Sequence, residues 1–100
     1  MVERLARAER DGLAEALPRW RSLPERDAIA QDWRFPSFSA AWGFLSRVAL
    51  LAERHGHHPE IGNVYGRVSL VLTTHDAGGL SERDVALARA IDALGPARPG

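Results

Sequence analysis

Histidines and carboxylates gather in two short segments of this 100-residue chain. His55, His57 and His58 fall in the run ERHGHHPE at 53–60, and His75 falls in the run TTHD at 73–76. Imidazole is the only side chain whose ordinary pKa, about 6.5, lets it both donate and accept a proton near neutral pH. Histidines grouped with carboxylates therefore favour acid–base chemistry, whereas a single histidine beside a helix end is more often a solvated surface group.

A third segment, GGLSERD at 78–84, carries a further carboxylate. The pattern Ser81-x-x-Asp84 is typical of a capping box at the start of a helix, which is a structural role for Asp84. A carboxylate at a helix N-terminus stays ionised, so the same Asp84 can also orient an imidazole. The two roles are compatible.

A metal site is the next alternative for these residues. The candidate ligands are sufficient for zinc in number: His55, His57, His58, His75, Asp76 and Asp84. Their spacing is not the His-x-x-x-His of a helical site, and the chain has no Cys. We therefore do not expect a metal site here.

The elements that must position these residues can be read from hydrophobic periodicity. The pattern predicts a helix over 2–17, a β-hairpin within 19–35 whose second strand is 28–35, and a helix over 37–55. Ser37 is the expected N-cap of that last helix and Gly56 its C-terminal glycine.

His57-His58-Pro59 is expected to be extended, because proline keeps the preceding residue out of the helical region. Neighbouring side chains of an extended segment point to opposite sides, so His57 and His58 should not face one ligand unless the backbone bends.

A second hairpin is predicted over 61–65 and 67–74, followed by a helix that begins at Ser81 and stops at Gly95-Pro96. Residues 95–100 are expected to form a frayed tail. The order α-β-β-α-β-β-α predicts a single α+β domain over 1–100, with a four-stranded antiparallel sheet and helices packed on one face. His75 then follows a strand and can meet the first histidine cluster across the sheet.

The tryptophans are core residues by default. Trp42 lies on the apolar stripe of the 37–55 helix and is assigned to packing. Trp20 precedes an irregular segment, so it either packs in the core or lines a pocket for a planar ring.

Composition excludes several classes of function. The formal net charge is zero, which argues against nucleic-acid binding. The absence of Cys excludes disulfides and thiolate chemistry. No apolar run approaches the roughly 18 residues of a membrane span, and the N-terminus lacks a signal-peptide core. We expect a soluble, cytoplasmic protein that binds neither nucleic acid nor membrane.

The spaced elements together resemble the pterin-4a-carbinolamine dehydratase family. The residues that carry the resemblance run in order through 13–94, and they are Trp20, Arg26-Asp27-Ala28-Ile29, Phe35-x-x-Phe38, Phe44, Arg47-Val48-Ala49, Glu53-x-x-x-His57-His58-Pro59, Asn63-Val64-Tyr65, Thr74-His75-Asp76 and Gly79-Leu80-Ser81-x-x-Asp84. Agreement of several spaced elements is more specific than any one short motif.

The resemblance implies an enzyme that dehydrates 4a-hydroxytetrahydropterins to quinonoid dihydropterins without metal or cofactor, in recycling the pterin of aromatic amino acid hydroxylases such as phenylalanine hydroxylase. Its catalytic residues fall on His57, His58, His75 and Asp84. Its substrate-binding positions are expected at Trp20, Glu53, Pro59, Thr73 and Thr74. It implies a homodimer or homotetramer. The alternative is a non-catalytic dimerisation or assembly module on the same fold.

Overall fold

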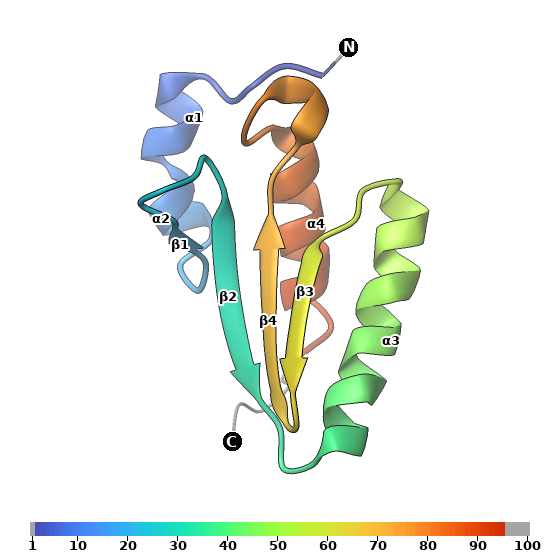
Figure 1. The fold of residues 1–100 in the computed structure, drawn as a ribbon. Coiled ribbons are helices and arrows are strands. Elements are labelled where there is room, and N and C mark those ends of the chain that lie inside the picture. The colour runs from blue at the N-terminus through green and yellow to red at the C-terminus, as the bar shows by residue number, and fades with distance from the viewer. Residues whose placement is uncertain (1, 96–100) are drawn as a thin grey trace.

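Four antiparallel strands and four α-helices make up residues 2–95, which are the residues that the computed structural model describes. The elements are α1 (Arg7–Asp11), α2 (Leu13–Ala16), β1 (Arg21–Ser22), β2 (Ile29–Arg34), α3 (Phe38–His55), β3 (Glu60–Val64), β4 (Arg67–Leu72), the 3₁₀ turn η1 (His75–Ala77) and α4 (Glu82–Asp92). The strands lie in the order β1-β2-β4-β3, so β4 is central beside β2 (Figure 1). The predicted α+β class and the antiparallel sheet are confirmed.

The sheet register separates a covered face from an open one. The cross-strand pairs Ile29↔Leu72, Gln31↔Leu70 and Trp33↔Val68 are all buried. The alternating pairs Asp32↔Ser69 and Arg34↔Arg67 are exposed. Because side chains alternate along a strand, one face carries the core and the other meets solvent. The helices therefore lie against one face of the sheet, as predicted.

Helix α3 begins and ends where the sequence predicts. The Ser37 hydroxyl accepts a hydrogen bond from the Ala40 N–H at 3.0 Å, and Gly56 closes the helix in the left-handed region with φ of 61°. The left-handed conformation favours glycine, because a Cβ there meets the following carbonyl. This ending is what turns the chain toward His57.

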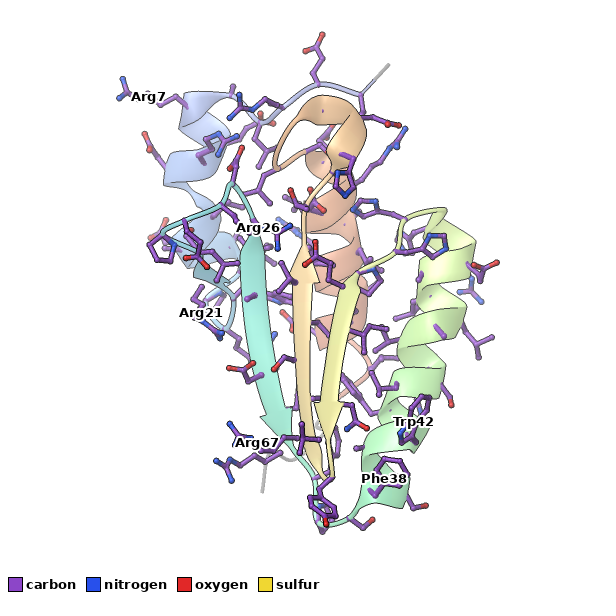
Figure 2. All side chains as sticks on the ribbon, viewed as in Figure 1. Arg7, Arg21, Arg26, Phe38, Trp42 and Arg67 are labelled. Carbon is purple, nitrogen blue, oxygen red and sulfur yellow. The ribbon has the colours of Figure 1, made fainter. Side chains whose placement is uncertain are left out.

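The packing role assigned to Trp42 is wrong. Trp42 is 50% exposed and Phe38 is 55% exposed, and Figure 2 shows both on the half of α3 that follows Ser37. The inward stripe instead centres on Phe44, whose ring lies 4.9 Å from that of Trp33. The apolar positions of α3 extend beyond the arc that the sheet and α4 cover, and periodicity alone does not show which part of a wide stripe faces inward.

The single helix predicted over 2–17 is also wrong. Residues 2–6 are extended: Arg4 forms an isolated bridge with Ser81, and the Leu5 N–H donates to the Leu80 carbonyl at 2.8 Å. The helical part is divided at Gly12 into α1 and α2. Glycine is a poor helix residue, and pairing with the Leu80 backbone satisfies groups that a longer helix would have used.

Asp27, in the loop between β1 and β2, connects the N-terminal segment to the loop before α4. Its carboxylate accepts hydrogen bonds from Arg4 at 3.0 Å, from Arg10 at 2.6 and 2.7 Å, and from the Leu80 N–H at 3.3 Å. The hydrogen bond from Arg10 is the main reason that the pKa of Asp27 lies well below its ordinary value. This ion cluster holds residues 79–81 in place, and so positions the start of α4.

Helix α4 begins after the predicted N-cap Ser81 and ends at Asp92, short of the predicted stop. Its buried residues are Asp84, Leu87, Ala88 and Ile91. The part of the expected tail at 96–100 lies outside the described residues. None of the helices in residues 2–95 has the length and apolar content needed to cross a membrane.

Candidate active site

The first turn of α4 holds a carboxylate that is entirely removed from solvent. Asp84 is 0% exposed and forms the predicted capping box with Ser81, whose backbone N–H donates to Asp84 Oδ2 at 3.0 Å. The Thr74 hydroxyl donates to the same oxygen at 2.7 Å. A buried carboxylate must be hydrogen-bonded to be tolerated, and these donors meet that requirement on one oxygen.

His57 occupies the other oxygen of Asp84. The left-handed turn at Gly56 brings the His57 N–H onto the Ala52 carbonyl at 3.1 Å, which fixes the residue against the end of α3. Its ring Nε2 then lies 2.6 Å from Asp84 Oδ1. Because an ionised carboxylate can only accept, His57 carries a proton on Nε2.

The remaining ring nitrogen of His57 is available for chemistry. Nδ1 of His57 has no hydrogen-bond partner within residues 2–95, yet this part of the chain contains no buried side-chain nitrogen or oxygen atom that lacks a partner. Nδ1 therefore reaches the surface, although the His57 side chain is only 9% exposed. A neutral His57 with its proton on Nε2 presents a lone pair at Nδ1, which can accept a proton.

His58 points into a different environment. Its Nε2 donates to Glu53 Oε2 at 2.9 Å, and the two side chains are 65% and 78% exposed. Glu53 is thus the partner of His58, and Asp84 is the partner of His57. The expected alternation along the extended segment 57–59 holds: one imidazole is buried against α4 and its neighbour faces solvent.

The structure nevertheless brings the three histidines to one place. A hollow of about 300 Å³ is lined by His57, His58, His75, Thr73, Thr74 and Arg83, together with Gly56 and Asp76. His75 reaches it from η1, the short turn that follows β4. The hollow thus lies where the end of α3, the end of β4 and the start of α4 meet. Three imidazoles around one cavity can supply both a proton donor and a proton acceptor.

A second hollow of about 330 Å³ shares Thr73, Thr74 and His75 with the first, and is otherwise lined by Arg26, Asp27, Gly78 and Gly79. Arg26 lies on its wall and donates to Glu60 through two hydrogen bonds of 2.8 and 2.6 Å. That ion pair lowers the pKa of Glu60 and raises the pKa of Arg26. The two hollows meet at Thr73–His75, so these residues contact both.

Three of the five expected substrate-binding residues line neither hollow, namely Trp20, Pro59 and Glu53, and Glu53 reaches the site only through its hydrogen bond with His58. Trp20 is buried against Trp33, and its indole N–H donates to Asp92 at the far end of α4 from Asp84. Within one chain this is a core position. Pro59 is half-buried and lines neither hollow. Thr73 and Thr74 line both hollows, but the Thr74 side chain is directed at Asp84.

Sequence reasoning did not select Arg83 or Arg26 for this site. Arg83 lines the histidine hollow with its guanidinium 3.9 Å from Asp76, and Arg26 lines the adjoining one. The position of Arg83 next to Asp84 in the capping box was the available signal, because the first turn of a helix presents successive side chains around its end. In residues 2–95 no group of three or more His, Asp or Glu side chains converges in a way that could hold a metal ion.

Comparison with known proteins finds relatives that match nearly the whole chain. The model of the family described as pterin 4 alpha carbinolamine dehydratase matches residues 3–94. A protein of Rhizorhabdus wittichii, provisionally named pterin-4-alpha-carbinolamine dehydratase, is 57% identical over 93 residues, which are 93% of this chain and 96% of that protein. One of Burkholderia cenocepacia with the same provisional name is 50% identical over 101 residues, covering 100% of this chain and 99% of its own.

Two solved structures share the fold. The crystal structure of a transcriptional coactivator/pterin dehydratase from Brucella melitensis matches with a TM-score of 0.86 and 39% identity, covering 92% of this chain and 98% of that one. A pterin dehydratase-like protein identified as a RuBisCO assembly factor in the alpha-carboxysome matches with a TM-score of 0.64 and 28% identity, covering 77% and 89%. The family model and the curated relatives both extend over nearly the whole chain, which therefore belongs to the pterin 4 alpha carbinolamine dehydratase family.

Proposed function

We propose that this protein is a hydro-lyase that converts a 4a-hydroxytetrahydropterin to the quinonoid dihydropterin and water. The observation that carries the proposal is the single hollow lined by His57, His58 and His75, with His57 held by a buried carboxylate. Loss of the 4a-hydroxyl requires an acid that makes water the leaving group, and loss of the N5 proton requires a base. Imidazoles supply both near neutral pH, and positioned acid–base catalysis contributes about 10² to 10⁴-fold.

We assign the roles within the site as follows. His57 and His75 exchange protons with the 4a-hydroxyl, and His58 binds the pterin or accepts the N5 proton. Asp84 orients His57 and stabilises its protonated form without touching the substrate. No metal or organic cofactor takes part in the proposed mechanism.

The direct test is to generate the 4a-hydroxytetrahydropterin and follow its ultraviolet decay with and without the protein. We expect acceleration above the spontaneous rate, reduced at least tenfold by His57→Ala and by His75→Ala. His55→Ala is the matched control, because His55 is exposed and lines neither hollow. A decay rate equal to the spontaneous one would rule the proposal out.

The cellular setting proposed is the cytoplasm, where the reaction recycles the pterin of aromatic amino acid hydroxylases, phenylalanine hydroxylase among them. Support for this comes only from the family. Adding the protein to a phenylalanine hydroxylase reaction with limiting pterin should remove the accumulated 4a-hydroxy intermediate and raise turnover. An unchanged hydroxylation rate under conditions where the intermediate accumulates would contradict this role.

We also propose that the chain forms a homodimer or homotetramer. Large apolar side chains on the outer surface support this: Phe38, Trp42 and Leu50 of α3, with Ile61, Val64 and Tyr65 of the β3 edge and its turn, are all at least half exposed. Exposed apolar patches and an unpaired strand edge are typical of association surfaces. Light scattering that reports a monomer at micromolar concentration would contradict it.

A second function, as an assembly module without catalysis, is favoured by the RuBisCO assembly factor that shares the fold. Under that alternative the histidine hollow has no catalytic role, and His57→Ala and His75→Ala would leave the association of the protein with its partner intact. The two candidates are separated by the decay assay above.

A further inference from the structure

We propose that Thr74 is a positioning residue of the dehydratase site, which holds Asp84 in the orientation that fixes the proton on Nε2 of His57. The inference rests on the proposed function for its kinetic consequences. Although Thr74 lines both hollows, it is only 2% exposed, and its hydroxyl is directed at Asp84.

The hydroxyl groups of Ser81 and Thr74 form a series of hydrogen bonds that all donate toward Asp84. Thr74 Oγ1 lies 2.7 Å from Asp84 Oδ2 and 2.7 Å from Ser81 Oγ. A hydroxyl has one hydrogen to donate, and an ionised carboxylate can only accept. Thr74 therefore donates to Asp84, and Ser81 donates to Thr74, while Ser81 Oγ accepts from the Arg83 N–H at 3.2 Å. Every hydrogen of the series is directed toward the carboxylate.

These hydrogen bonds fix the plane of the Asp84 carboxylate, because each of its two oxygens meets a different set of donors. Oδ2 receives two donors, the Thr74 hydroxyl and the Ser81 N–H, and Oδ1 receives His57 Nε2 at 2.6 Å. The backbone N–H cannot rotate away, and the Thr74 hydroxyl adds a second contact to the same oxygen. The carboxylate plane is thereby held, and with it the proton on Nε2, which leaves the lone pair of neutral His57 on Nδ1.

Packing alone does not account for a hydroxyl at position 74. Valine has nearly the shape of threonine, and an unpaired hydroxyl in a dry site is unfavourable. The backbone of residue 74 forms the isolated bridge with Gly79, and its side chain contacts the buried start of α4, where an apolar side chain would serve a purely structural role. The hydroxyl is explained by its donation to Asp84.

The test compares Thr74→Val, which keeps the shape, with Thr74→Ser, which keeps the hydroxyl. We expect Thr74→Val to lower kcat for 4a-hydroxypterin decay about tenfold or more with KM within about threefold, and to displace the pH profile of kcat. Thr74→Ser should retain kcat within about threefold. Equal losses in both variants, or an unchanged kcat and pH profile in Thr74→Val, would overturn the proposal.

A spectroscopic readout separates this inference from the proposed function. The His57 Nε2–H should give a strongly downfield proton resonance in the free protein, because its hydrogen bond to the carboxylate is short. We expect that resonance to move or exchange away in Thr74→Val and to persist in Thr74→Ser. If the wild-type protein shows no dehydratase activity while the resonance responds in this way, the dehydratase proposal fails and the positioning role stands. A resonance unchanged in a folded Thr74→Val refutes the positioning role whatever the activity.

Should Thr74→Val fail to fold, Ser81→Ala takes its place, because it removes the hydroxyl that donates to Thr74. The expected effect has the same direction and is smaller, a loss of about twofold to fivefold in kcat with a displaced His57 resonance. A folded Ser81→Ala with wild-type kcat and an unmoved resonance would then overturn the proposal.

Discussion

The substitution Asp84→Asn probes the site most directly, because it changes one atom of a fully buried group. The Ser81 N–H is a fixed donor and must keep an acceptor, so the amide oxygen of Asn takes the place of Oδ2, where Thr74 also donates. The amide nitrogen then takes the place of Oδ1 and presents N–H to His57. The position of Oδ1 contacts only His57, which accommodates a donor by moving its proton from Nε2 to Nδ1.

The consequence for catalysis follows from that tautomer. A proton on Nδ1 removes the lone pair through which neutral His57 would accept a proton, so His57 no longer serves as a base toward the substrate. Protonation of Nε2 would place two N–H groups against each other, so His57 is also a poor acid. We expect kcat to fall about 100-fold, the lower end of the range for positioned acid–base groups, with KM nearly unchanged.

The cost in stability should be substantial. Hydrogen bonds to a charged partner contribute about 1.5–3 kcal/mol and those between neutral groups about 0.5–1.5 kcal/mol. Each of the three contacts therefore weakens by about 1–1.5 kcal/mol, which lowers the free energy of unfolding by roughly 3–4.5 kcal/mol. Asp84→Ala should cost more, because it leaves the Thr74 hydroxyl, the Ser81 N–H and His57 Nε2 without their acceptor. Denaturant unfolding of the two variants measures the difference.

Asp92→Asn is the matched control. Asp92 lies on the same helix and accepts side-chain hydrogen bonds from Trp20 and Gln31, but at the opposite end from the histidines. It should lower stability while leaving kcat within about twofold of wild type. If folded Asp84→Asn keeps kcat within about threefold of wild type, the tautomer argument is refuted, and so is the role given to His57 Nδ1.

The remaining predictions concern stability. Arg10 holds the pKa of Asp27 below its ordinary value of about 4, so the stability that this ion pair contributes is present above pH 4 and is lost as the pH falls toward the lower folded-state pKa. In Asp27→Asn the free energy of unfolding should therefore fall less steeply as the pH is lowered below about 4. Asp32 forms an exposed pair with Arg21, so Asp32→Asn should leave this pH dependence nearly unchanged. Gly79→Ala should destabilise the protein, because a Cβ there would lie 1.9 Å from Asp27 Oδ2. Gly43→Ala, within α3 and with nothing within 4 Å of the added Cβ, should stabilise by about 0.5–1 kcal/mol. Thermal unfolding of both alanine variants measures the two changes in stability. A Gly79→Ala melting temperature equal to or above that of the wild type would contradict the predicted destabilisation.

Local signals were sufficient for much of the fold. Helix α3 was predictable because Ser37 and Gly56 bracket an apolar stripe, and β4 because Val68, Leu70 and Leu72 alternate with polar residues. The helix over 2–17 was not, because its first residues pair with Leu80, a partner distant in sequence. Hydrogen bonds to distant residues outweigh weak local helix propensity, and periodicity does not reveal them.

For the site, the sequence predicted the residue types and the local backbone structure that carries them. These are three histidines, an extended segment ended by Pro59, and Asp84 in a capping box. These depend on short-range chemistry, namely proline sterics and the free N–H groups of a helix start. Tertiary structure decided the pairings. In the folded chain His57, and not His58, contacts Asp84, while His58 contacts Glu53. Thr74 donates to the Asp84 carboxylate, and Trp20 lies in the core with its indole N–H on Asp92. Such pairings depend on how β4 and the ends of α3 and α4 meet in space, and that is settled by the packing of the whole core.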